Sequence, residues 1–251
     1  QRQMCIRDRG TSVCGNDCEN GKAYKRNFRG GNPGDGSYRD SIQSAGGNEN
    51  PGMVDSMKVL DQYEGKNFVL YNGDSVEVLQ GIPDNSIHFS VTSIPFASLY
   101  TYSNSDRDMG NSRTYEEFAK QYMFLGKEWF RVMMPGRNVS IHCMNLPTSK
   151  ERDGYIGIRD FRGDVIRWMQ SIGFIYHSEV CIWKNPVTAM QRTKALGLLH
   201  KQIKKDSCMS RMGIPDYVVT FRKPGDNPER VEHTNESYPV DHWQQVASPI
   251  W

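Results

Sequence analysis

The residues best suited to chemistry lie together in one short run, residues 92–100, which follows an apolar segment. A hydroxyl residue, Ser93, stands two positions before a proline and three before an aromatic ring, Pro95 and Phe96. A hydroxyl oxygen can bind the polar edge of a planar group, while a proline fixes the backbone and a ring stacks on the planar face. The run therefore predicts a loop that holds a planar, polar group.

Segments with strand patterns and segments with helix patterns alternate on both sides of this loop. Apolar or alternating runs predict strands at residues 68–71, 87–92, 139–144, 174–183 and 217–221. Apolar spacings of three and four predict helices at residues 75–80, 115–132 and about 160–171. Thr114 and Glu117 form a capping-box pattern before the longest helix. Such alternation is typical of an α/β fold, whose loops at the strand ends carry function.

Composition excludes several classes of protein. The chain of 251 residues has a formal net charge of +2, and it contains neither a run of about eighteen apolar residues nor an N-terminal leader pattern. We therefore expect a soluble, cytoplasmic protein with no membrane partner. Cys5, Cys14 and Cys18 could supply three zinc ligands, but they lack a Cys-x-x-Cys spacing and a nearby histidine. Free thiols are the favoured interpretation, and no metal is expected.

The first 66 residues contain two glycine-rich stretches and almost no apolar periodicity. Such a segment buries too little apolar surface to offset the entropy of ordering it. A phosphate-binding loop is disfavoured because no predicted strand precedes the glycines and no Gly-Lys-Ser/Thr follows them. We therefore predict a disordered or extraneous segment at residues 1–66 and a folded domain at residues 67–251. The part of this domain after Pro224 is expected to be irregular.

A basic insert at about residues 184–215 contrasts with the nearly neutral charge of the whole chain. A charge run of this kind is either a solvated helix face or a surface for a nucleic acid. The candidate substrate-binding cations of the insert are Lys184, Arg192, Lys194, Lys201, Lys204 and Lys205.

Three motifs in unbroken order give the chain a family resemblance that runs from about residue 68 to residue 251. They are Asn72-Gly73-Asp74-Ser75, Ile82-Pro83-Asp84-Asn85-Ser86 and Val91-Thr92-Ser93-Ile94-Pro95-Phe96. With them the chain resembles the amino-directed DNA methyltransferases that use S-adenosylmethionine, in the circular order where the catalytic motif precedes the cofactor motif, and especially the phage-type methylases. The resemblance implies a Rossmann-like methyltransferase sheet, here incomplete, with the basic insert in the place of the family's DNA-recognition segment.

The resemblance also implies a catalytic role for the loop of Ser93, Ile94, Pro95 and Phe96. The Ser93 oxygen and the Ile94 carbonyl would accept the two hydrogens of an exocyclic amino group on adenine or cytosine, while Phe96 would stack on the flipped base. The family has a proline where this chain has Ile94. Isoleucine still supplies the carbonyl but lacks the fixed backbone angle, so we expect weaker preorganisation of the loop.

The remaining candidate residues have less specific signals. Asp74 is either an N-cap for the helix that begins at Ser75 or, by resemblance, a contact with the adenosine part of the cofactor together with Ser75. Tyr100 and Tyr102 would line the base pocket or reach the DNA. Three histidines in predicted strands are interpreted as core residues and receive no role: His88, His142 and His177.

The glycine-rich cofactor motif of the family is not found after Pro224. We therefore expect a fragment that binds S-adenosylmethionine weakly or not at all, with a second half or a second copy of the chain as a candidate partner. Two alternatives stay open beside a DNA amino-methyltransferase: a non-catalytic DNA-binding remnant and an RNA amino-methyltransferase. The sequence does not decide between adenine and cytosine.

Overall fold

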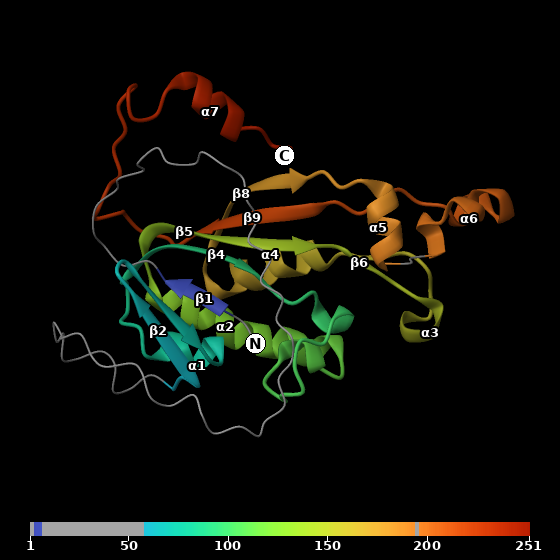
Figure 1. The fold of residues 1–251 in the computed structure, drawn as a ribbon, viewed down its shortest axis with the longest axis horizontal. Coiled ribbons are helices and arrows are strands. Elements are labelled where there is room, and N and C mark those ends of the chain that lie inside the picture. The colour runs from blue at the N-terminus through green and yellow to red at the C-terminus, as the bar shows by residue number, and fades with distance from the viewer. Residues whose placement is uncertain (1–2, 7–57, 194–195) are drawn as a thin grey trace, which may run out of the picture.

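The computed structural model describes residues 3–6, 58–193 and 196–251, and Figure 1 shows their arrangement. The largest sheet has the strand order β4 (Ile87–Ser93), β5 (Met133–Met144), β9 (Asp216–Arg222) and β8 (Ile175–Ile182). Strand β4 runs parallel to β5, whereas β9 is antiparallel to both β5 and β8. The carboxyl ends of β4, β5 and β8 therefore lie together, at the end of the sheet where β9 begins. The predicted α/β class is confirmed.

A smaller antiparallel sheet has the order β1 (Gln3–Ile6), β3 (Phe68–Asn72) and β2 (Asp61–Gly65). Because β1 and β2 precede residue 67, the prediction of a disordered or extraneous segment at residues 1–66 is wrong for these two strands. The first four residues of β2 are exposed. A strand held mainly by backbone hydrogen bonds to its neighbour leaves no apolar alternation in the sequence, so the residues of β2 show no hydropathy pattern that predicts a strand.

Helices α2 (Tyr115–Val132) and α4 (Phe161–Ile172) pack against one face of the main sheet. Thr114 Oγ1 accepts a hydrogen bond from the backbone N–H of Glu117 at 3.1 Å, as the capping-box pattern predicts. The helices share a core with alternate residues of β5 and β9, each 0% exposed: Val139, Ile141, Cys143, Val219 and Phe221. The sheet is thus firmly packed on this side.

The opposite face of the sheet is more polar and more open. Side chains of a strand alternate between faces, so Ser140 and His142 lie on the side away from α2 and α4. At the edge of the sheet, Phe89 and Val91 of β4 are 58% and 68% exposed. Within the described residues β4 pairs only with β5, so this strand has one open edge beside two exposed apolar side chains.

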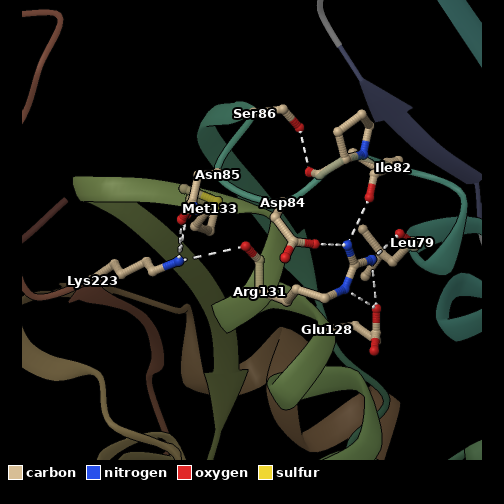
Figure 2. Close-up of polar contacts among 10 residues, drawn as sticks. Leu79, Ile82, Asp84, Asn85, Ser86, Glu128, Arg131, Met133 and Lys223 are labelled. Carbon is tan, nitrogen blue, oxygen red and sulfur yellow. Dashed lines mark hydrogen bonds and ion pairs between the residues drawn. The ribbon is translucent and has the colours of Figure 1, made fainter.

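The turn that leads into β4 is fixed by Arg131 at the end of α2, as Figure 2 shows. Its guanidinium donates hydrogen bonds to the carbonyl oxygens of Leu79 and Ile82 at 2.7 and 2.8 Å. Leu79 belongs to α1 (Ser75–Gln80), which precedes the turn. The same guanidinium forms ion pairs with Asp84 and Glu128 at 2.5 and 2.8 Å. Arg131 therefore ties α1, the turn and α2 together.

Lys223, directly after β9, holds the other side of the same turn (Figure 2). Its ammonium donates to Asn85 Oδ1 at 2.7 Å and to the Met133 carbonyl at 2.8 Å. Asn85 adopts a φ of 53°, a left-handed conformation that asparagine tolerates better than most residues. Burial lowers the pKa of Lys223. This cluster lies where β4 and β5 begin, at the far end of β4 from Ser93.

The basic insert leaves the sheet at the edge where β8 ends and returns where β9 begins. It contains α5 (Pro186–Thr193), α6 (His200–Lys205) and two short 3-10 helices, at Leu196–Leu198 and Ser207–Met209. In Figure 1 it extends away from this edge, on the side where α3 (Lys150–Asp153) also lies. A two-stranded pair, β6 (Leu146–Pro147) with β7 (Ile158–Arg159), flanks α3.

The end of the chain is more ordered than expected. Helix α7 (Val240–Val246) forms after residue 224, and the last residues pair with β8 through a bridge between Cys181 and Ile250. The prediction of an irregular end is therefore wrong for this helix and for the last residues. The last residues pair with a distant strand, and the local sequence does not predict such hydrogen bonds. Within the described ranges, no helix is long and apolar enough to cross a membrane.

Candidate active site

The loop predicted to carry chemistry begins where β4 ends, at the edge of the sheet shared with the basic insert. Ser93 is the last residue of β4 and is exposed, whereas Ile94 is 3% exposed and belongs to the main core cluster. Phe96 is half-buried, and Ala97 follows it with a φ of 48°, which is uncommon for a residue with a Cβ. Burial of the Ile94 side chain anchors the loop to the core.

A chain of polar contacts links Ser93 to two neighbouring strands. His142 Nδ1 lies 2.9 Å from Ser93 Oγ, and His142 Nε2 lies 3.1 Å from Asp216 Oδ2. Lys184 Nζ lies 2.5 Å from the second carboxylate oxygen, Asp216 Oδ1. Strand register causes this meeting, because Ser93 pairs with His142 and Asp216 pairs with Met144, two positions further along β5.

Among the four residues linked by these polar contacts, Asp216 is the most buried, with a side chain 11% exposed. Burial alone would raise the pKa of its carboxyl group, but hydrogen bonds from His142 and Lys184 outweigh burial and lower the pKa of Asp216 below the ordinary 3.8. Asp216 is therefore a carboxylate at neutral pH and can only accept hydrogen bonds.

The interpretation of His142 as a core histidine is wrong. Its side chain is 31% exposed, and its ring and the Phe96 ring lie edge to face, with the ring centroids 5.6 Å apart and an interplanar angle of 63°. The signal was present in the alternation Val139-Ser140-Ile141-His142-Cys143, which places the histidine on the polar face of its strand. His88, which pairs with Glu229 at 2.8 Å, and His177, which is exposed, also lie outside the core.

A cavity of about 660 Å³ opens beside the start of α1, and Asp74, Ser75 and Tyr102 all line it. Asp74 Oδ1 accepts hydrogen bonds from the backbone N–H groups of Val76 and Glu77 at 2.9 and 3.3 Å, so the N-cap interpretation is confirmed. Both bonds use the same oxygen, which leaves Oδ2 outside the cap. The structure thus brings two residues predicted to bind a cofactor together with one predicted to bind substrate, in a cavity that Ser93–Phe96 do not line.

The two tyrosines after the loop are exposed, Tyr100 by 44% and Tyr102 by 55%, with ring centroids 6.5 Å apart in an edge-on arrangement. Asp108 Oδ2 accepts hydrogen bonds from the backbone N–H groups of Tyr102 and Ser103 at 3.0 and 2.8 Å. The tyrosine pair therefore follows the Ser93–Phe96 loop in the chain, and Tyr102 lines the cavity.

The predicted basic residues divide into two groups. The ammonium of Lys184 is paired with Asp216, whereas the lysines of α6 are exposed to solvent: Lys201, Lys204 and Lys205. The side chain of Arg192 and all of Lys194 lie outside the described part of the structure. The exposed lysines belong to the insert that joins β8 to β9, and this insert leaves the sheet at the same end as Ser93, the last residue of β4.

Metal-binding residues were not expected, and the described residues contain no group of three or more His, Cys, Asp or Glu that could hold a metal ion. The side chains of Cys5, Cys14 and Cys18, the candidate zinc ligands, lie outside the described part of the chain.

Comparisons with known proteins bear on this arrangement. No family model matches the chain. The type II methyltransferase M.SfiI of Streptomyces fimbriatus is 30% identical over 79 residues, which are 32% of this chain and 18% of that protein. A protein of Thermus thermophilus assigned as a DNA modification methylase, solved in complex with S-adenosyl-L-methionine, superposes with a TM-score of 0.51 at 21% identity, covering 71% of this chain and 63% of that one.

The cytosine-N4-specific PvuII DNA methyltransferase gives a TM-score of 0.42 at 18% identity, with 62% of this chain and 50% of that chain covered. The chain thus spans less than a fifth of the curated relative and less than two thirds of the Thermus thermophilus structure. The likeness to the Thermus thermophilus structure shows a shared fold, so the predicted Rossmann-like α/β sheet is confirmed.

Proposed function

We propose that this chain is part of a DNA methyltransferase that transfers a methyl group to an exocyclic amino group of adenine or cytosine. The observation that carries the proposal is the place of Ser93–Phe96, at the carboxyl end of β4 in a methylase-type sheet. In open α/β sheets this edge is where ligands bind. The sequence similarity to a type II methyltransferase supports the same class of reaction.

The loop has the groups that such a reaction needs. An amino group attached to an aromatic ring is a poor nucleophile, because its lone pair is delocalised into the ring. The exposed Ser93 hydroxyl and the adjacent Ile94 carbonyl would accept its two hydrogens and direct the lone pair out of the ring plane. Phe96 would stack on the flipped base, which offsets part of the few kcal/mol that extrusion costs.

S-adenosylmethionine, when bound, supplies an electrophilic methyl group. The cavity beside α1 fits the adenosine part of this cofactor, because about 660 Å³ suits a ligand of that size and Asp74 directs a second carboxylate oxygen outside its helix cap. We assign Asp74 and Ser75 to this binding step. Tyr102, from the other side of the cavity, would pack against the bound group.

The methionine part of the cofactor needs backbone N–H groups of a glycine-rich turn, which we propose to come from a further strand added to the open edge of β4. Phe89 and Val91, 58% and 68% exposed, would be covered by the helix that follows such a strand. By this proposal the 251-residue chain binds the cofactor weakly. Calorimetry that gave a micromolar dissociation constant for this chain would contradict it.

The exposed lysines of α6 would bind DNA phosphates beside the catalytic loop. Each phosphate contact contributes about 0.9 to the slope of log affinity against log salt for duplex DNA. Replacing Lys201, Lys204 and Lys205 by alanine should therefore flatten this slope by about 2 to 3. The exposed α2 lysines, Lys120 and Lys127, serve as a matched control whose replacement should leave the slope unchanged. Equal slopes for all variants would show that α6 is a solvated helix face.

The function is tested by methyl transfer to duplex DNA and to structured RNA, with radiolabelled cofactor and a form of the protein that carries the additional strand. DNA labelling that is lost in Phe96→Ala but kept in Phe68→Ala, whose exposed ring contacts Tyr63 instead, would support the proposal. DNA binding without labelling would indicate a non-catalytic remnant. Labelling of RNA alone would indicate an RNA methyltransferase.

A further inference from the structure

We infer that His142, held by Asp216, directs the Ser93 hydroxyl group so that its lone pairs face the substrate, and that His142 receives the proton released during the reaction. This inference rests on the proposed function. It makes His142 and Asp216 positioning residues, since both act through Ser93.

The direction of the hydroxyl group follows from the order of the three groups. The carboxylate of Asp216 only accepts hydrogen bonds, so His142 Nε2, 3.1 Å from it, must carry a hydrogen. A neutral imidazole has one N–H group, which makes Nδ1 an acceptor. Ser93 Oγ, 2.9 Å from Nδ1, therefore donates its single hydrogen to His142.

This arrangement selects between substrate groups. A free hydroxyl group can rotate and act as either donor or acceptor. Once its hydrogen is committed to His142, Ser93 offers only lone pairs to the open face of the sheet. An amino group that donates a hydrogen bond is then favoured at this position, whereas a keto oxygen meets a second acceptor and is rejected.

The same contacts supply a path for one proton. When the amino nitrogen forms its bond to the methyl carbon, the electron pair of the broken carbon–sulfur bond returns to sulfur and the nitrogen becomes positively charged. The nitrogen then passes one proton to Ser93 Oγ, while the hydroxyl hydrogen of Ser93 moves to His142 Nδ1. The resulting imidazolium is stabilised by the carboxylate of Asp216 and later releases its proton to water, since His142 is 31% exposed.

Lys184 completes the arrangement by keeping Asp216 ionised. Its ammonium has donors and no acceptor, and it lies 2.5 Å from the oxygen that does not face His142. In Asp216→Asn the amide oxygen should turn toward Lys184, which leaves the amide NH₂ facing His142. Nε2 would then be an acceptor and Nδ1 would carry the hydrogen, so the Ser93 hydroxyl would have to accept a hydrogen bond from the ring.

The decisive measurement is the tautomer of His142 in the 251-residue chain at pH 7, read from the two ring nitrogen shifts in a long-range ¹H–¹⁵N correlation spectrum. Loss of signals in His142→Gln, or contacts to the Phe96 ring, assigns the residue. We expect the Nε2–H tautomer in the wild type and the Nδ1–H tautomer in Asp216→Asn. An Nδ1–H tautomer or an imidazolium in the wild type would overturn the inference.

Methyl transfer then tests the proton path in the form of the protein that is active. His142→Gln should lower kcat by about 10²-fold, the range of one acid–base group, with little change in KM for DNA. In a Ser93→Ala background the same substitution should have no further effect. A loss of equal size in both backgrounds would contradict action through Ser93.

A matched control comes from another histidine–carboxylate pair, whose histidine lies on β4. His88 Nε2 lies 2.8 Å from Glu229 Oε2, five residues before Ser93 on the same strand. Glu229→Gln should alter only the His88 signals and leave methyl transfer unchanged. If the wild type proves inactive on every nucleic acid, the proposed function fails, whereas the tautomer measurement on the 251-residue chain still decides the hydrogen-bond arrangement.

Discussion

Replacing Arg131 by methionine should destabilise the protein without disturbing the candidate site. Methionine keeps much of the aliphatic volume of the side chain but removes every hydrogen bond of the guanidinium in Figure 2. The substitution leaves the carbonyl of Ile82, a residue 4% exposed, without the donor that lies 2.8 Å away. The carbonyl of Leu79 keeps a second donor, the backbone N–H of Ile82 at 2.9 Å.

The size of the effect follows from these contacts. A hydrogen bond from a charged donor contributes about 1.5 to 3 kcal/mol when its loss leaves a buried acceptor unsatisfied, which applies to Ile82. The bond to Leu79 contributes about 1 kcal/mol because that carbonyl is still bonded. Asp84, with a side chain 66% exposed, adds little, and the pair with Glu128 adds at most about 0.5 kcal/mol. The expected loss is about 3 kcal/mol.

Urea unfolding followed by circular dichroism measures this loss as a lower midpoint at an unchanged slope. Arg167→Met is the matched control, since Arg167 is 60% exposed and pairs only with Asp164 and Asp160 among the described ion pairs; its loss should be below about 1 kcal/mol. The tautomer of His142 should be the same in both variants, because the Arg131 cluster lies at the other end of β4. Equal midpoints for Arg131→Met and Arg167→Met would refute the reasoning.

Two further predictions concern titratable groups. Burial raises the pKa of Cys143 to about 12. In the folded protein, iodoacetamide at pH 8 should therefore alkylate the exposed Cys208 and spare the buried Cys143, which mass spectrometry of peptides can measure. Rapid labelling of Cys143 would contradict its burial. The pKa of Asp216 is lower in the folded than in the unfolded state, so its stabilisation is complete above about pH 4 and is lost as the pH falls through the folded-state pKa. Urea titrations between pH 7 and pH 2 should therefore show a smaller loss of unfolding free energy below about pH 4 in Asp216→Asn than in the wild type, and equal losses would argue against the lowered pKa.

Sequence patterns determined the elements that depend on near neighbours. The spacing of Phe118, Tyr122, Leu125 and Trp129 predicted α2, and all four are buried in it. The strands at β4, β5, β8 and β9 were predicted in order, although β5 begins at Met133 instead of residue 139. These features are local, because helical spacing, strand alternation and caps are set within a few residues of each position.

Elements stabilised from a distance escaped prediction. Strand β2 is polar and exists through its pairing with β3, while the last residues of the chain are held by β8. The hydrogen-bond partners of these elements lie on other segments, so neither the hydropathy nor the secondary-structure propensity of their own residues predicts them. The open edge of β4 was not predicted either, since the local sequence does not show which segments pair beside this strand or cover Phe89 and Val91.

The candidate site divides in the same way. By itself the sequence determined the loop from Ser93 to Phe96 and the cap at Asp74, because each needs only its own short run of residues. Only the tertiary structure decided that His142 and Asp216 belong to the site. Their side chains meet Ser93 through the register of three strands that are distant in the chain, and register is set by packing of the whole sheet.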